Sequence, residues 1–485
     1  MKKSIAKNYI YNLIYQMLTI LLPLITTPYL SRVLGSENIG IYGYTFSIVT
    51  YFVLFGSLGL SMYGQREIAY NMNNKTNRSK VFWEIIIVRC ITILLSILVF
   101  YFTFARIGDY SLYYKILIIQ LIATAFDISW LFQGIEEFDK TVIRNLIIKS
   151  LSLILIFTVV NNKNDLWKYF LIYVGSELIG NISLWFYIPK YISKINIKKL
   201  NLKKHIKPAL ALFLPQVAIQ IYTVLDKTMI GLITDNMSEV GFYEQAQKIV
   251  KSSLLIISAL QLVMNSRIAN AYAENNKKEI KECLEKSFNF VWFISIPMVF
   301  GLIALAPKLV PWFYGEGFDG VTNIIIATVP IILAIGLNGI TGVQYLVQIK
   351  KQNIFTLSVV IGAIVNFVLN IILIKYFGGI GAAIASVTAE TVIFLVQLKY
   401  FKEMFSLKEI LKLSIKCFIS GIIMFVVLFI CVYYMPISII NSFIQVILGG
   451  FIYLLVLYLL NYRFLKDLIS QGMSIIYNFG KGGRK

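Results

Sequence analysis

The sequence is poor in the side chains on which most enzymes and metal proteins depend. Its 485 residues hold one histidine, His205, and four cysteines, Cys90, Cys283, Cys417 and Cys431. The cysteines show none of the close pair spacings of zinc sites, and a lone histidine in a basic loop is a poor start for a metal site or for acid–base catalysis. We therefore expect no metal site, no cofactor and no catalytic residues.

Charge is also scarce, since only 14% of the residues are charged and 58% are hydrophobic. Mean hydropathy is +0.75, which is too high for a soluble core of this length. Apolar runs of about 20 residues recur along the whole chain, and each can cross a ~30 Å hydrocarbon layer as a helix. No Gly-rich phosphate loop, HExxH or GxSxG motif interrupts them. We predict an all-α polytopic membrane protein without a sizeable soluble domain.

The apolar runs predict about fourteen transmembrane helices. The predicted spans are 9–31, 39–63, 82–104, 112–134, 142–161, 168–189, 208–233, 240–264, 287–306, 322–348, 353–376, 379–401, 413–434 and 438–461. Most lysines and arginines outside them fall in alternate loops, which places both termini in the cytoplasm by the positive-inside rule. The net charge of +21 therefore reflects topology and contact with anionic membrane lipids, not nucleic acid.

A sequence echo predicts two similar halves. Ile39-Gly40-Ile41-Tyr42 returns as Val240-Gly241-Phe242-Tyr243, and so long an offset suggests duplication instead of a short-period solenoid. We expect two pseudo-symmetric six-helix lobes followed by two additional helices. The predicted domains are the N-terminal lobe 1–189, a basic cytoplasmic linker 190–207, the C-terminal lobe 208–402, and the last two helices with a basic tail, 403–485.

Ionisable residues inside the predicted spans are the candidate functional residues. A charge at the centre of a membrane helix costs about 2.5–3.5 kcal/mol on insertion scales, so it needs a partner, a wet cavity or a route to the surface. Arg32 and Lys149 lie near span ends, where snorkelling to the headgroups is as good an explanation as a cavity role. Arg89 and Asp127 lie deeper, which favours a cavity.

The second half carries a similar set of charges. Asp226 and Lys227 are neighbours that point about 100° apart on a helix, so they do not simply neutralise each other. Glu244, Lys248 and Lys251 fall on one helical face, either as a Glu244–Lys248 intrahelical pair or as the wall of a water-filled cavity. Two carboxyls remain, Glu177 and Glu390; each is either a neutral hydrogen-bonded group or a site of protonation or cation binding.

Four stretches resemble a known family. They are PLITTPYLSRVLGSENIGIYGY (23–44), YGQREIA (63–69), DISWLFQGIEEFDKTVIRN (127–145) and LDKTMIGLITDNMSEVGFYEQAQKI (225–249). These resemble Wzx-type oligosaccharide flippases of the multidrug/oligosaccharidyl-lipid/polysaccharide exporter superfamily, and the likeness extends over essentially the whole chain. Flippases for capsule and for teichoic-acid precursors are both similar to it.

The resemblance implies two six-helix lobes around a cationic cavity. It also implies a cargo, an undecaprenyl-pyrophosphate-linked glycan that moves from the inner to the outer leaflet of the bacterial cell membrane. Motif positions of the family fall on Arg32, Asp127, Asp226, Lys227 and Lys248. From burial and the polar stripe we add the others: the predicted substrate-binding residues are Arg32, Arg89, Lys149, Lys227, Lys248 and Lys251. The predicted ion-coupling residues, for H⁺ or Na⁺, are Asp127, Asp226, Glu177 and Glu390.

Other functions compete with this interpretation. A drug or cation antiporter of the same superfamily would favour an acidic pocket, whereas cations here at least match anions. A peptidoglycan-precursor flippase is a closer alternative, and only the sequence motifs argue against it. A membrane glycan polymerase would need a larger outer loop than the one near 307–321, although polysaccharide polymerase machinery is an expected partner. A purely structural scaffold would not need so many buried charges.

Overall fold

The computed structural model describes residues 5–195 and 200–470, and every regular element in these ranges is a helix. The first part of the chain contains α1 (Ile5–Ser57), α2 (Leu60–Tyr70), α3 (Lys75–Phe100), η1 (Tyr101–Ala105), α4 (Ser111–Phe126), α5 (Ser129–Gly134), α6 (Phe138–Val159), η2 (Lys163–Asp165), α7 (Leu166–Trp185), α8 (Ile188–Tyr191), α9 (Lys203–Thr234) and α10 (Met237–Ala273). The second part contains α11 (Lys277–Tyr314), α12 (Asp319–Thr328), α13 (Ile331–Asn338), η4 (Gly339–Val347), α14 (Gln352–Phe401), α15 (Leu407–Tyr434) and α16 (Ile439–Leu459).

The predicted all-helical membrane architecture is confirmed in its coarse form. Ten of the described helices are long and apolar enough to cross a membrane. Two of them, α1 and α14, each cover two predicted spans, and α9 and α10 are helices over spans 208–233 and 240–264 but are not among the ten. The count of fourteen spans and the cytoplasmic termini therefore stay predictions.

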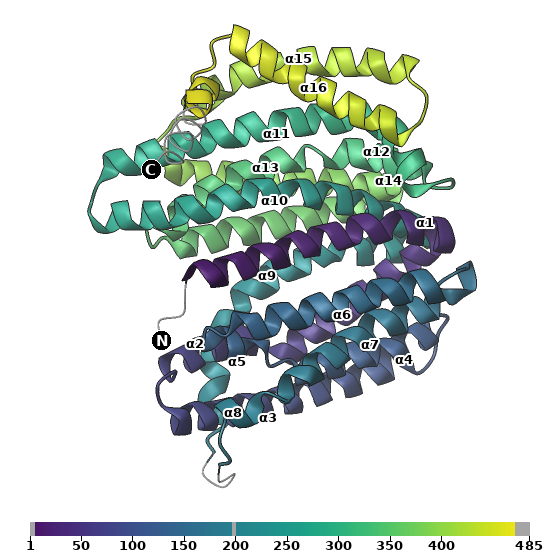
Figure 1. Cartoon of the computed structure of the whole chain (residues 1–485), viewed down its shortest axis with the longest axis vertical. Helices are drawn as coiled ribbons and strands as arrows, with labels where there is room; N and C mark the ends of the chain where they lie inside the picture. The colour runs from purple at the N-terminus through teal and green to yellow at the C-terminus, as the bar shows by residue number, and fades with distance from the viewer. Residues whose placement is uncertain (1–4, 196–199, 471–485) are drawn as a thin grey trace, which may run out of the picture. The chain divides into compact units, whose positions relative to one another are not determined.

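The chain divides into two compact units, 1–244 and 245–485. In the first unit α1 packs on α3, α4 and α6, while α7 packs on α4 and α6 (Figure 1). In the second unit α11 packs on α12, α13, α15 and α16, and α14 packs on α12 and α13. The division falls inside α10, whereas the predicted lobes meet at linker 190–207, of which 196–199 lie outside the described residues. The predicted lobes stay a prediction.

Glycines, not prolines, interrupt the long helices. Pro23 and Pro28 both lie inside α1, and Gly35 (φ 79°, ψ 171°) is the residue of α1 with non-helical angles. Gly378 (φ 53°, ψ −131°) interrupts α14 in the same way. These positive φ values are strained for residues with a Cβ. Each glycine lets two predicted spans meet with almost no intervening loop.

A buried hydrogen-bond cluster fixes the start of α9. His205 was expected in a basic loop; instead it is buried on α9, where its Nδ1 lies 2.8 Å from the Tyr63 hydroxyl. Its Nε2 lies 2.8 Å from the Glu84 carboxylate, which also accepts from Asn201 N and Lys204 Nζ. A neutral imidazole that accepts from Tyr63 and donates to Glu84 satisfies both contacts. The cluster therefore joins α2, α3 and the segment leading into α9.

This cluster predicts a loss of stability in acid. Burial lowers the pKa of His205, although Glu84 opposes the shift. The unfolded chain then binds the proton first, so the contribution is present above about pH 6.5 and is lost as the pH falls below it. We expect the midpoint temperature of thermal unfolding of the detergent-solubilised protein to fall more steeply from neutral to mildly acidic pH than the midpoint of the His205→Gln variant. Parallel pH profiles for the two proteins would contradict this assignment.

Candidate functional site

The charged doublet Asp226-Lys227 of α9 meets Tyr243 and Glu244 of α10 across the hairpin of these two helices. Lys227 Nζ donates to Glu244 Oε2 at 2.9 Å, and both side chains are mostly buried. The Tyr243 hydroxyl donates to Asp226 Oδ2 in a short hydrogen bond, and Asp226 is buried. The turn at Asp235 sets the register of the two helices. The adjacent residues Asp226 and Lys227 therefore pair with the adjacent residues Tyr243 and Glu244. As predicted, Asp226 and Lys227 do not neutralise each other, because each has its own partner on α10.

The echoed glycines make the closest helix contact of this region. A methyl group at Gly40 would lie 1.6 Å from the Met237 carbonyl oxygen, and one at Gly241 would lie 2.1 Å from the Ser36 carbonyl oxygen. Each glycine thus faces the carbonyl four residues before the other glycine. Small residues let membrane helices approach this closely. The sequence echo therefore marks a symmetric crossing of α1 with the start of α10.

A cluster of tyrosines lies near the Lys227–Glu244 pair. Tyr42 of α1 packs against Tyr169 and Tyr173 of α7 at ring-centroid distances of 5.0 and 5.9 Å. A methyl group at Gly43, the neighbour of Tyr42, would lie 3.7 Å from Glu244 Cβ, so the ion pair lies beside α1 at this point. Such rings combine an apolar face with a polar tip. A cation, a carboxylate and aromatic faces can together contact a ligand that has anionic and hydroxyl-rich parts.

Arg89 is packed into a break between two helices. Its side chain is fully buried, and it donates from Nη1 to the Asp127 carbonyl oxygen at 2.5 Å and from Nη2 to Ser61 Oγ at 2.5 Å. The Asp127 carboxylate lies 4.0 Å from Nη1 and accepts a hydrogen bond from the backbone N–H of Ser129, the first residue of α5. Trp130 Nε1 also donates to the Asp127 carbonyl oxygen. Asp127 and Trp130, an Asp-x-x-Trp motif, therefore form the junction of α4 and α5, and the hydrogen bonds of Arg89 hold this junction together.

A second charged group lies farther along α6 and α7. The Glu177 carboxyl has Gln120, Asp127, Arg144 and Lys149 as its polar neighbours. Glu177 is on the exposed surface of α7, whereas Lys149 is partly buried on α6. Both predicted residues therefore belong to one electrostatic group, and Asp127 connects that group to Arg89.

The remaining predicted residues are Arg32, Lys248, Lys251 and Glu390. Arg32 is exposed and donates to the Pro28 carbonyl oxygen of its own helix. Lys248 and Lys251 follow on α10 within the second unit. Glu390 is buried in the second unit and accepts a short hydrogen bond from the Asn338 amide, beside the π-helix η4. Stretches of π-helix are frequent at functional sites.

The aromatic partners of the charged doublet are not evident from the sequence. The cost of buried charge points to Glu244, but it gives no role to Tyr42, Tyr169, Tyr173 and Tyr243. Two of the four belong to the echoed Gly-x-Tyr motif, and this repetition is the one signal that singles them out among 30 tyrosines. The described residues contain no group of three His, Cys, Asp or Glu side chains that could hold a metal ion.

The all-helical fold, with ten described helices long and apolar enough to cross a membrane, defines a multi-pass membrane protein. The polysaccharide biosynthesis protein family matches residues 5–265, and the lipid II flippase MurJ family matches residues 147–456. The chain belongs to the polysaccharide biosynthesis protein family, within the superfamily that its sequence motifs resemble. The predictions of a Wzx-type flippase and of a transporter instead of an enzyme are confirmed.

Relatives extend over most of the chain. A putative O-antigen transporter of Escherichia coli K12 is 24% identical over 397 residues, which cover 81% of this chain and 95% of the relative. A probable low-salt glycan biosynthesis flippase of Haloferax volcanii is 25% identical over 48% of this chain and 49% of its own length. Among solved structures, lipid II flippase MurJ in an inward closed conformation superposes with a TM-score of 0.75 at 19% identity, covering 95% of this chain and 100% of that one.

Proposed function

We propose that this protein flips undecaprenyl-pyrophosphate-linked oligosaccharide repeat units across the cytoplasmic membrane for the synthesis of a surface polysaccharide such as capsule, O-antigen or teichoic acid. The observation that carries the proposal is the mostly buried Lys227–Glu244 pair beside the tyrosines of α1 and α7. The names of the relatives, an O-antigen transporter and a glycan biosynthesis flippase, favour a lipid-linked glycan as cargo.

The cation of the pair would exchange partners during transport. In this structure Glu244 satisfies Lys227, as a mostly buried ammonium requires. When cargo enters, the pyrophosphate takes the place of the carboxylate, and the tyrosine rings contact the sugars. The polyprenyl tail stays in the lipid, and alternating access carries the headgroup across. Arg32, Lys149, Lys248 and Lys251 remain further candidate phosphate contacts.

Ion coupling is a separate part of the proposal. Glu390 is the strongest candidate because it is buried and hydrogen-bonded to an amide, so its charge is expensive there. Asp127, Asp226 and Glu177 remain candidates with weaker support, since Asp127 accepts a hydrogen bond from Ser129 N and Asp226 accepts one from the Tyr243 hydroxyl. Uptake of H⁺ or Na⁺ at Glu390 would then accompany one step of the cycle.

The partner exchange predicts opposite effects for the two sides of the ion pair. Lys227→Ala should weaken binding of a lipid-pyrophosphate probe by about tenfold or more, because a charge-assisted hydrogen bond is lost. Glu244→Gln should retain or strengthen binding, because it removes the competing carboxylate. Binding is measured with the purified protein in nanodiscs. The pair would have only a structural role if wild type and both variants bound the probe equally well and the two variants lost the same amount of thermal stability.

A second candidate cargo is the peptidoglycan lipid precursor. The match of residues 147–456 to the lipid II flippase MurJ family favours it. The two cargoes share the polyprenyl pyrophosphate and differ in the attached glycan. Rescue of a strain depleted of its peptidoglycan-precursor flippase would support this second candidate.

A further inference from the structure

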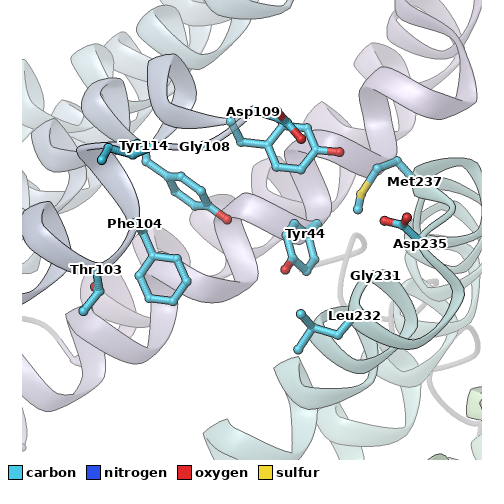
Figure 2. Close-up of a pocket in the computed structure, with 12 residues that line it drawn as sticks. Tyr44, Thr103, Phe104, Gly108, Asp109, Tyr114, Gly231, Leu232, Asp235 and Met237 are labelled. Carbon is cyan, nitrogen blue, oxygen red and sulfur yellow. The ribbon is translucent and has the colours of Figure 1, made fainter.

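A separate pocket opens between α1, the segment from η1 to α4, and the end of α9. It has a volume of about 250 Å³, and Figure 2 shows Tyr44 between Asp109 on one side and Asp235 on the other. The loops that hold Asp109 and Asp235 follow predicted spans 82–104 and 208–233, which places them on the predicted outer side of the membrane. Neither Lys227 nor Arg89 lines this pocket.

The aromatic wall of this pocket is held in place by close packing. The Tyr44 ring rests on Gly231, where a methyl group would lie 2.3 Å from the ring carbon Cδ2. Tyr110 meets Tyr44 edge to face at 6.1 Å, and the buried Tyr114 also lines the pocket. Gly108 has a φ of +121°, a value that few other residues adopt, so it shapes the loop that carries Asp109 and Tyr110.

The pocket is acidic. Asp109 and Asp235 line it, and both are exposed. Burial raises the pKa of Tyr110, and the carboxylates of Asp109, Asp235 and Glu37 raise it further, which shows that three acidic groups act on this one ring. Among the described residues that line the pocket, none is lysine, arginine or histidine. Such a site repels phosphate and other anions, in contrast to the cation at Lys227.

We infer that this pocket binds one neutral or amino sugar residue. The tyrosine rings offer flat apolar faces for the C–H face of a pyranose, while its hydroxyl or ammonium groups donate to Asp109 and Asp235. Pockets for drug-sized ligands measure about 300–1,000 Å³, so this smaller one suits a single sugar ring. Identification of that sugar with the glycan part of the cargo rests on the proposed function. The pocket would then be a subsite that receives the glycan on the outer side.

Sugar binding can be measured directly by saturation-transfer NMR on the full chain in nanodiscs. The probes are free glucosamine, N-acetylglucosamine and glucuronic acid. We expect wild type to bind the first two and to bind glucuronic acid about tenfold more weakly. The double variant Asp109→Asn and Asp235→Asn should bind glucosamine about tenfold more weakly. The difference in affinity between glucosamine and glucuronic acid should therefore become smaller. Asparagine tolerates the left-handed backbone of Asp235 (φ 51°), so the turn is kept.

The matched control is Asp319→Asn, which changes the same kind of residue at the first turn of α12 in the second unit and should bind like wild type. Thermal unfolding shows whether the double variant is folded; if it is not, Tyr110→Leu replaces it and should lose N-acetylglucosamine binding. Absence of saturation transfer in wild type, or equal transfer in wild type and a folded pocket variant, would overturn the inference. Because the assay needs no transport, failure of the proposed function would leave its result unaffected.

Discussion

Alanine at Gly241 is expected to disrupt the crossing of α1 and α10 and to abolish transport. The new methyl group would lie 2.1 Å from the Ser36 carbonyl oxygen, and backbone atoms cannot move aside as a flexible side chain can. Overpacking costs about 1–3 kcal/mol, and contact with backbone on both helices should put this variant at the upper end or above. Gly40→Ala should behave alike, since its methyl group would lie 1.6 Å from the Met237 carbonyl oxygen.

The matched control is Gly175→Ala in α7, where a methyl group would meet no atom within 4 Å. Alanine is the better helix former, so this variant should be as stable as wild type or more stable by about 1 kcal/mol. Thermal unfolding of the purified proteins measures the stability of Gly241→Ala and of Gly175→Ala. If Gly241→Ala unfolded at the temperature of Gly175→Ala, the close crossing of α1 and α10 would be contradicted.

Removal of Arg89 is expected to have an effect of similar size on stability. Its guanidinium is fully buried and holds the Asp127 carbonyl oxygen and Ser61 Oγ at the junction of α4 and α5. Loss of one member of a buried charged network costs about 3–5 kcal/mol. We therefore expect Arg89→Ala to lower the midpoint of unfolding strongly, whether or not cargo is present.

Arg66→Ala is the control for this variant, because the exposed Arg66 pairs with the half-buried Glu67 at 3.7 Å near the surface. Exposed pairs contribute about 0–1 kcal/mol, so little change is expected. The experiment also tests the prediction that Arg89 binds substrate. A stable Arg89→Ala protein that had lost binding of the lipid-pyrophosphate probe would assign Arg89 to the cargo and contradict its structural role at the junction of α4 and α5.

The class of fold could be predicted from the sequence because hydrophobic runs and loop charges are local signals. The helix break at Asp127 could not, since the apolar run 112–134 continues through it without interruption. That break depends on Arg89, Ser61 and Trp130, which supply hydrogen bonds from three different elements. Likewise, nothing near His205 in the chain indicates burial, because its partner Glu84 lies 121 residues away.

The candidate site was predicted in part for the same reason. The cost of charge in a membrane pointed to Asp226 and Lys227, and their divergent directions on a helix required two partners. The identity of those partners depends on the register of the α9–α10 hairpin, which hydropathy does not encode. The Gly-x-Tyr echo was visible, but its meaning as a contact between Gly40 and Gly241 emerges only in three dimensions.

The most direct test of the proposed function is to locate the lipid-linked glycan in cells that lack this gene. We predict that undecaprenyl-linked repeat units accumulate on the cytoplasmic face and that surface polysaccharide is lost. Gene copies with Gly175→Ala should restore the polymer, whereas copies with Lys227→Ala should not. Normal lipid-linked glycans and normal surface polysaccharide, together with new sensitivity to cationic drugs, would contradict the proposed flippase function and indicate an antiporter.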